Sequence, residues 1–146
     1  MLRGNYTATI DDKGRLKVPA QFRRRIEDRY GADVYVTSLS GESVWIYPMP
    51  EWESIEQRLA ITSMMDKAKR KFLDRTNYFG QQTEIDAQGR VLIPQIIRKS
   101  ASILGEVVVL GHLTYLEIWE AEAFQRNLHG NPLTAEDESS LMLLGI

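Results

Sequence analysis

The sequence has no cysteine, which excludes disulfides, thiolate metal ligands and a cysteine nucleophile. Its two histidines, His112 and His129, stand 17 residues apart, which is not the spacing of a metal site. Phosphate-binding glycine loops and nucleophile motifs are missing as well. We therefore expect a protein that is not an enzyme, with no small-molecule substrate, no metal and no cofactor.

Long apolar runs are also missing. No run approaches the roughly 18 residues of a membrane span, and residues 1–15 lack the apolar stretch of a secretory signal. We expect a cytoplasmic protein without a membrane partner. At 146 residues with 43% hydrophobic and 26% charged residues, the composition is typical of one globular domain, or of two small units that share a core.

Neither sign of charge dominates, since the net charge is −2, but the charge is polarised along the chain. Residues 11–25 contain six basic and two acidic side chains, whereas residues 120–146 contain one basic and five acidic side chains. A net negative charge argues against nucleic-acid binding by the whole surface. The basic segment could still bind an anionic partner locally.

The chain contains an internal repeat. "IDDKGRLKVP" at residues 10–19 and "IDAQGRVLIP" at residues 85–94 share Ile, Asp, Gly, Arg and Pro at identical spacing. Arg23 and Arg98 follow at the same offset of 75 residues. This agreement indicates two copies of one supersecondary unit.

Matching segments continue after each copy. Runs rich in β-branched and aromatic residues predict strands at 33–39, 43–48, 106–112 and 115–120. Helices are predicted directly after Pro19 and Pro94, at 50–59 and 121–128, and across 61–80, where Met64, Met65 and Phe72 recur at helical spacing. We divide the chain into unit 1 (1–60), a helical connector (61–80), unit 2 (81–128) and a C-terminal helix (129–146).

Two of these helices carry distinctive surfaces. The connector has a basic face at residues 67–71, which we interpret as solvated rather than as a nucleic-acid contact. The C-terminal helix has Thr134 as its expected N-cap and acidic residues in its first turn. Its "LMLL" segment, residues 141–144, should pack on this molecule or on a neighbour.

The repeated turns contain the candidate site. Gly14 and Gly89 stand where a tight turn needs positive φ, and Asp11 and Asp86 can accept backbone N–H groups or pair with the arginine four residues later. Leu16 and Val18 should point inward, so that Arg15 and Lys17 lie on the opposite face. With Lys13, these side chains form a basic loop that can contact phosphates and base edges. The candidate DNA-binding residues are Lys13, Arg15, Lys17, Arg24 and Arg90.

The doubled motif, "DDKGRLKVP" and "DAQGRVLIP" with "NYF" before the second copy, resembles the MraZ family of bacterial transcriptional regulators. That family has tandem SpoVT/AbrB-like units. The resemblance implies an α+β, mainly β fold, in which two pseudo-symmetric units interleave their swapped hairpins into one barrel with peripheral helices.

The resemblance also implies a nucleoid-associated protein that assembles into a homo-oligomeric ring. Such rings bind short, G-rich direct repeats of double-stranded promoter DNA ahead of the division and cell-wall gene cluster, including the regulator's own gene. By this likeness the DNA-facing residues are Lys13, Arg15 and Arg90. The second loop is less basic, because Gln88 and Leu92 replace Lys13 and Lys17. We therefore expect the first loop to make the main contacts to DNA.

Two alternatives remain open. The basic loop could dock an acidic partner, or a neighbour's acidic C-terminal segment, in a ring-shaped protein scaffold without a DNA role. An antitoxin-like AbrB-fold protein is the other alternative. It is disfavoured because the motif is doubled and the C-terminus is predicted to be helical rather than disordered.

Overall fold

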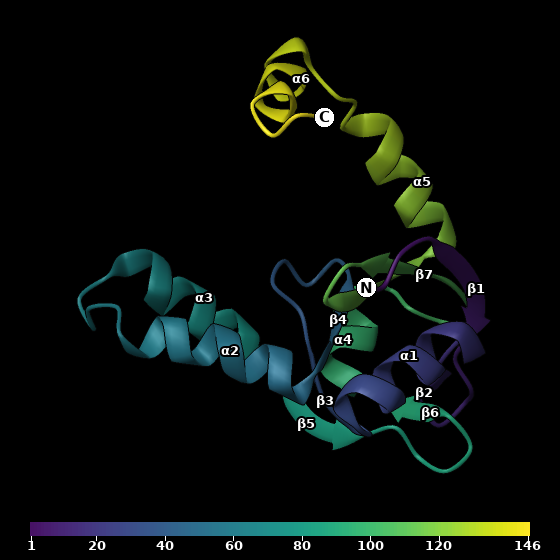
Figure 1. Cartoon of the computed structure of the whole chain (residues 1–146). Helices are drawn as coiled ribbons and strands as arrows, with labels where there is room; N and C mark the ends of the chain where they lie inside the picture. The colour runs from purple at the N-terminus through teal and green to yellow at the C-terminus, as the bar shows by residue number, and fades with distance from the viewer.

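The computed structural model describes all residues from 1 to 146 (Figure 1). The strands are β1 (Asn5–Thr9), β2 (Arg15–Lys17), β3 (Asp33–Thr37), β4 (Val44–Pro48), β5 (Gln81–Glu84), β6 (Arg90–Leu92), β7 (Glu106–His112) and β8 (Tyr115–Glu120). The helices are α1 (Ala20–Tyr30), α2 (Met49–Ala60), α3 (Lys67–Tyr78), α4 (Gln95–Ser100), α5 (Ala121–Gly130) and α6 (Ala135–Met142). Each strand expected from its β-branched and aromatic residues is confirmed.

Six strands form one antiparallel sheet in the order β1-β7-β8-β4-β3-β5. The hairpins β3–β4 and β7–β8 meet at the centre, where Val44 pairs with Ile118. Each outer edge comes from the other unit, because β1 pairs with β7 and β5 pairs with β3. The two units have thus exchanged their outer strands.

The remaining strands, β2 and β6, form a separate antiparallel ribbon in which Leu16 lies opposite Val91. The ribbon contacts the sheet at both edges, through β1 next to β2 and β5 next to β6. A bridge between Ile10 and Leu16 reinforces the first contact. The ribbon thus bridges the two edges of the sheet, and the eight strands together form a small barrel.

The core lies inside this barrel. Alternate residues of β3 and β7 point inward, as the period of two requires, and Val34, Val36, Val107 and Val109 have no exposed surface. Both units contribute to one continuous apolar cluster of 20 residues. A single half could not build this core, because its strands would leave their apolar faces in water.

Two helices close the barrel. α1 and α4 begin directly after Pro19 and Pro94, as predicted, because proline donates no N–H and its φ is compatible with a helix start. α1 buries Phe22 and Ile26, and α4 buries Ile97. The same prolines therefore end the ribbon strands and direct each chain segment onto the core.

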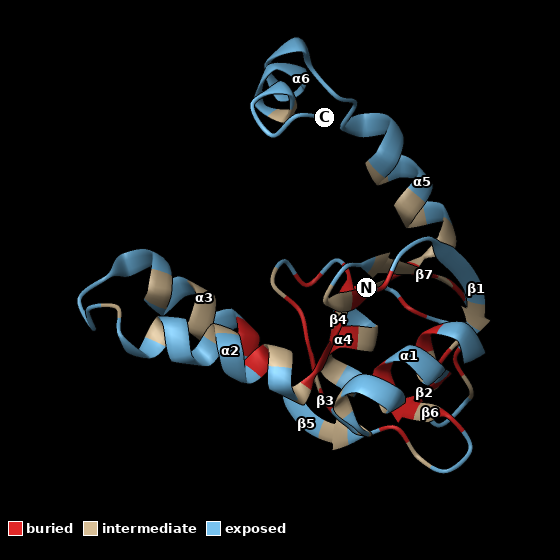
Figure 2. Ribbon diagram, viewed as in Figure 1, coloured by how far each residue is buried: buried red, intermediate tan, exposed pale blue.

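The other four helices extend from the barrel as two arms (Figures 1 and 2). In the first arm α3 runs back along α2, and the rings of Trp52 and Phe72 stack with centroids 6.0 Å apart. In the second arm, α5 contacts the sheet through Phe124 on Trp119, but α6 has no buried residue. Every helix of the chain is too short or too polar to cross a bilayer.

One detail of the helix predictions is wrong, and another is narrowed. The connector helix begins at Lys67 rather than near residue 61, because the Asp66 side chain caps it by accepting the N–H of Lys69 at 2.7 Å. Met64 and Met65 consequently lie in the turn before the helix, each 88% exposed. Of the two sites expected for the "LMLL" segment at the C-terminus, packing on this molecule is not observed for Met142, Leu143 and Leu144, which are at least 73% exposed, so packing on a neighbour stays a prediction.

Candidate nucleic-acid interface

The first loop joins β1 to β2 and is organised by one carboxylate. Asp11 Oδ1 accepts the backbone N–H of Lys13 at 3.0 Å and of Arg15 at 2.9 Å, while Oδ2 accepts Nε of Arg15 at 2.9 Å. Gly14 supplies the left-handed conformation with φ of 83°. The backbone N–H of Arg15, aided by its guanidinium, holds the pKa of the Asp11 carboxyl below its ordinary value, so the loop contains an ionised brace.

The second loop, between β5 and β6, repeats this geometry. Asp86 Oδ1 accepts the N–H of Gln88 at 2.8 Å and of Arg90 at 2.9 Å, and Gly89 has φ of 79°. The backbone N–H of Arg90 is the main cause of a lowered pKa at Asp86. The ion pair to Nε of Arg90 is longer, at 3.3 Å. The second brace is therefore the looser of the two.

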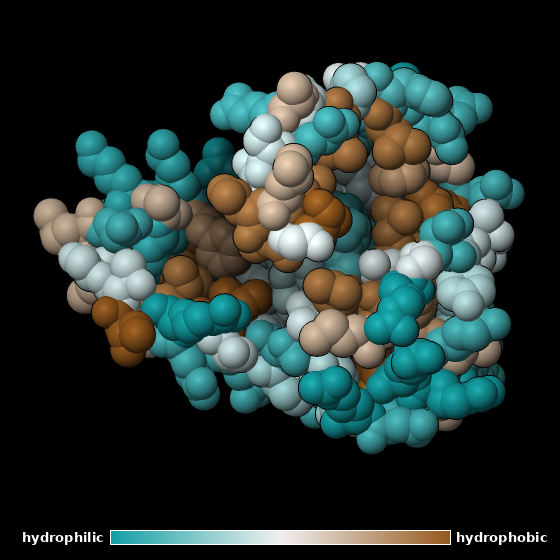
Figure 3. Space-filling view, turned by 45° about the horizontal axis from the view of Figure 1, so that its top comes forward, coloured by the Kyte–Doolittle hydropathy of each residue, from teal (hydrophilic) through white to brown (hydrophobic).

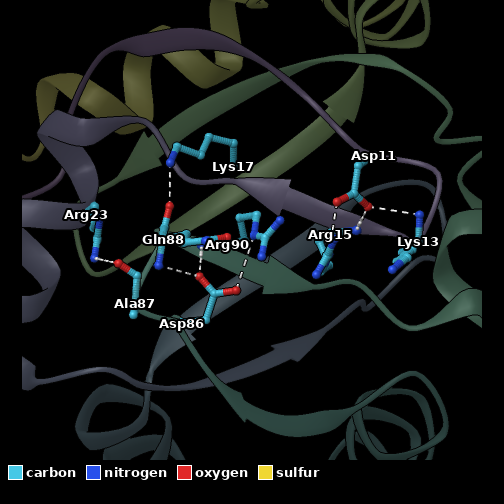
Figure 4. A network of polar contacts seen from close by, with 9 residues as sticks. All are labelled: Asp11, Lys13, Arg15, Lys17, Arg23, Asp86, Ala87, Gln88 and Arg90. Atoms are coloured by element: carbon cyan, nitrogen blue, oxygen red, sulfur yellow. Dashed lines mark hydrogen bonds and ion pairs between the residues drawn. The ribbon is translucent and has the colours of Figure 1, made fainter.

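The antiparallel ribbon holds the two loops at its opposite ends, because Arg15 lies opposite Leu92 and Lys17 lies opposite Arg90 (Figure 4). The N–H of Val18 donates to the Gly89 carbonyl at 2.9 Å, and the N–H of Ile93 donates to the Gly14 carbonyl at 2.9 Å. Each turn glycine thus receives a hydrogen bond from the strand of the other loop. Backbone bonds, rather than side chains alone, fix the spacing between the two turns.

A pair of arginines completes this arrangement, and sequence reasoning assigned them no role. A Cβ added at Gly14 would lie 2.4 Å from Cζ of Arg98, and one added at Gly89 would lie 2.9 Å from Nη1 of Arg23. Arg98 donates from Nε to the Ile93 carbonyl at 2.9 Å, and Arg23 donates from Nη2 to the Ala87 carbonyl at 3.2 Å. Each arginine therefore packs on the turn of the opposite loop. Their identical offset in the repeat was the available signal.

The residues predicted to contact DNA occupy different positions on the ribbon and its loops. Lys13 is exposed at the tip of its loop, while the side chains of Arg15 and Arg90 retain 30% and 28% of their exposure. Both arginines use Nε within the chain, and their terminal nitrogens make no hydrogen bond there. Lys17 is exposed, but its ammonium donates to the Gln88 carbonyl across the ribbon.

Arg24 is placed apart from the loops. It is exposed on α1 and lines a groove together with Arg3 and Arg25, next to Tyr6. No ion pair joins Arg24 to an acidic residue of the chain. The structure therefore separates two basic surfaces, one at the paired loops and one along α1.

The chemistry available at the loops is binding. The carboxylates are held ionised by N–H donors, which suits a structural brace and not a general acid. No group of three histidine, aspartate or glutamate side chains is placed to hold a metal ion. The loops present guanidinium and ammonium donors to solvent at a fixed spacing. These donors match phosphate oxygens and the acceptor edges of bases.

Three features define the class of protein: the two units exchange their outer strands, β2 and β6 pair in a ribbon, and the Asp-Arg turn occurs twice. This is a duplicated AbrB-like protein of the α+β class, in which two pseudo-symmetric units with swapped hairpins share one barrel and helices lie at the periphery.

Comparison with known proteins specifies the family. Residues 1–75 and 80–142 match the family model described as "MraZ protein, putative antitoxin-like". The chain is 53% identical over 146 residues to a protein of Acidobacterium capsulatum and 48% identical over 147 residues to one of Koribacter versatilis, with both chains covered completely in each case. A protein of Shewanella frigidimarina is 33% identical, with 91% of this chain and 89% of its own length covered. All three are named transcriptional regulator MraZ. The chain belongs to the MraZ family.

Proposed function

We propose that this protein is a sequence-specific, DNA-binding transcriptional regulator. It binds short direct repeats in its own promoter, ahead of the division and cell-wall gene cluster, as a ring-shaped homo-oligomer on the nucleoid in the cytoplasm. The names of its relatives support the regulatory role. The paired loops support the mode of binding.

One observation carries the proposal. Two arginines, each braced through Nε by an aspartate, keep their terminal nitrogens free on a shared rigid ribbon. A guanidinium held in this way needs little further ordering to donate two hydrogen bonds to O6 and N7 of guanine. G-rich repeats are the sequences that such a pair would select.

The first loop should provide most of the binding free energy. Lys13 lies beside Arg15 and can contact a phosphate, whereas Gln88 takes the corresponding place beside Arg90. Lys17 keeps two N–H donors after its bond to the Gln88 carbonyl, because an ammonium has three. Arg24 would add a phosphate contact from α1. Arg90 then makes a secondary contact or orients the second loop.

Repetition explains how so small a surface binds tightly. One loop makes only a few contacts, but in a ring each bound loop raises the effective concentration of the next one to about the millimolar range. Direct repeats in the DNA then match repeated loops in the protein. Binding should fall steeply with salt, because each neutralised phosphate releases counterions.

The test is the affinity of Arg15→Ala for the protein's own upstream DNA, measured by fluorescence anisotropy at several salt concentrations. We expect each base contact that is lost to cost about 1 to 3 kcal/mol, which is about 5- to 150-fold in affinity. Arg126→Ala is the matched control, because it removes the same charge from an exposed position on α5. Wild-type affinity and salt dependence in Arg15→Ala would refute the assignment.

A ring scaffold without a DNA role is the second candidate, and the acidic, exposed C-terminal segment favours it. In that case the basic loops would dock acidic protein surfaces. A titration with the upstream DNA and with a scrambled duplex of equal length separates the candidates. Equal binding to both duplexes, fully suppressed by salt, would favour the scaffold.

A further inference from the structure

The C-terminal segment is capped at both ends but contains no buried residue. Thr134 and Asp137 form a capping box, in which the N–H of Thr134 donates to Oδ2 of Asp137 at 2.9 Å and the N–H of Asp137 donates to Oγ1 of Thr134 at 3.1 Å. At the other end Gly145, with φ of 79°, allows the N–H of Ile146 to bond the Leu141 carbonyl at 3.2 Å. This is a Schellman turn, so α6 has complete caps.

Caps alone cannot hold so short a helix in water. α6 has eight residues, and isolated helices shorter than about 12 to 15 residues are marginal even with favourable sequences. Its apolar residues Met142, Leu143, Leu144 and Ile146 are 73 to 90% exposed. A cluster of this kind indicates a surface that becomes covered by a partner.

The tip of the other arm shows the complementary chemistry. Ile61, Met64 and Met65 are each 88% exposed in the turn between α2 and α3. This turn is held in place, because Asp66 caps α3 and the Lys69 ammonium donates to the Thr62 carbonyl at 2.9 Å. The methionines are thus presented by an ordered turn, and their flexible side chains adapt well to a docking segment.

Charge favours the same pairing. Beside the apolar tip, Lys67, Arg70 and Lys71 are exposed and make no ion pair within the chain. In the first turn of α6, ahead of its apolar C-terminal end, Glu136 and Glu138 are likewise exposed and unpaired. α5, onto which α6 would otherwise fold, has Glu122 and only Leu128 as a large exposed apolar residue. The tip of the first arm therefore presents more exposed apolar and basic side chains that α6 could contact than α5 presents.

Within one chain the two arms extend from the barrel in different directions (Figure 1), and hydrophobic side chains lie open on both in the view of Figure 3. We infer that the C-terminal segment, residues 134–146, docks on the α2–α3 tip of a second copy of this chain, with leucines on methionines and acidic residues on basic ones. The donor and acceptor surfaces differ, so each molecule gives one tail and receives one. Such a head-to-tail contact closes into a ring when the rotation per subunit allows it.

This inference rests on the ring of the proposed function and specifies its contact. Its test uses no DNA. A negative result would therefore not contradict DNA binding by Arg15, and a failure of DNA binding would not contradict this contact between subunits.

Because the chain has no cysteine, single cysteines can report the contact directly. Leu143→Cys and Met64→Cys proteins are purified separately, mixed, and oxidised, so that only a disulfide between molecules can join the two variants. We expect the mixed dimer to form about a hundredfold faster than for Leu143→Cys with Leu104→Cys, which is the ratio of a millimolar local concentration to about 10 µM protein in solution. Leu104 is a matched control because it is 84% exposed and lies on neither arm. Equal rates in the two mixtures would overturn the inference.

Two further measurements separate this contact from misfolding and from docking of α6 on its own chain. Charge reversal in Glu136→Lys with Glu138→Lys should lower the native mass of the assembly, and adding Lys67→Glu with Lys71→Glu to the same chain should restore it. Restoration cannot come from misfolding, whereas an assembly that stays broken contradicts the charge pairing. A fast disulfide within one chain carrying Leu128→Cys and Leu143→Cys would place α6 on its own α5 and also overturn the inference.

Discussion

The two units of this molecule differ least in their backbone turns and most in what they present to solvent. Both loops use an aspartate brace, a glycine at positive φ and an arginine across the ribbon. Around this frame Lys13 becomes Gln88, and the closed α2–α3 arm corresponds to an open α5–α6 arm. Duplication therefore kept the parts that hold the barrel together. The exposed parts diverged into one strongly basic loop, one weakly basic loop and two unlike arms.

The strongest test of the shared frame is the ribbon core. Leu16 and Val91 lie opposite each other with no exposed surface, one from each unit. We expect Leu16→Ala to lower the free energy of unfolding by about 3 kcal/mol, because it removes buried methyl groups and leaves a cavity. Val91→Ala should cost less, because it removes fewer atoms. Chemical denaturation followed by circular dichroism measures both.

The same denaturation experiment also tests whether the two units fold together. Since both units contribute to one core, each variant should unfold in a single cooperative transition. Two separate transitions, one of them unaffected by Leu16→Ala, would show that the units fold independently.

Substitution of the turn glycines is expected to have the next largest effect. Gly14→Ala and Gly89→Ala each force a side chain into the left-handed region, which costs about 1 to 2 kcal/mol. Gly14→Ala should be the more destabilising, because the new Cβ would lie 2.4 Å from Cζ of Arg98 and would displace that side chain from the Ile93 carbonyl. The midpoints of thermal unfolding measure which of the two variants is the less stable.

A second substitution separates strain from the clash. In Gly14→Ala combined with Arg98→Ala the added destabilisation should shrink to the backbone cost alone, as a double-mutant cycle can show. Additive effects of the two substitutions would mean that Arg98 does not pack on this turn.

The difference in basic charge can be tested by making the loops alike. Gln88→Lys places an ammonium where the first loop has Lys13, and we expect the salt dependence of promoter binding to steepen by about one unit for one added phosphate contact. Binding isotherms at several salt concentrations give the slope. Gln57→Lys, exposed on α2, is the matched control and should leave the slope unchanged. Equal slopes for both variants would show that the second loop does not face DNA.

Local signals in the sequence were sufficient for most of the elements. β-branched and aromatic runs predicted the strands β3, β4, β7 and β8, the glycines at 14 and 89 predicted turns with positive φ, and Thr134 predicted the cap of α6, because each depends on neighbouring residues. The start of α3 was missed because helical spacing continues through Met64 and Met65, while the Asp66 cap decides the boundary.

Contacts between distant segments could not be read in this way. Nothing in β1 itself shows that it pairs with β7 of the other unit, since its residues fit any neighbouring strand. The packing of Arg23 and Arg98 on opposite turns depends on this exchange as well. Only the repeat offset, together with the resemblance to a family of swapped hairpins, indicated that the strands after the two loops would pair.

The smallest expected effect concerns the two aspartate braces at low pH. In the folded protein the pKa of Asp11 and of Asp86 lies below the ordinary value of 3.8, so both carboxylates stabilise the fold above that pH and lose their effect as the pH falls through the lowered pKa. Asp11→Asn should therefore lower stability at pH 7 and flatten the loss of stability that sets in as the pH falls below about 4, where the carboxyl of the unfolded chain titrates. Asp86→Asn should do the same more weakly, because its ion pair to Arg90 is longer, at 3.3 Å against 2.9 Å. Denaturation midpoints measured across this pH range decide the ranking, and a steeper acid dependence in Asp11→Asn than in the unaltered protein would mean that the carboxylate does not brace the first loop.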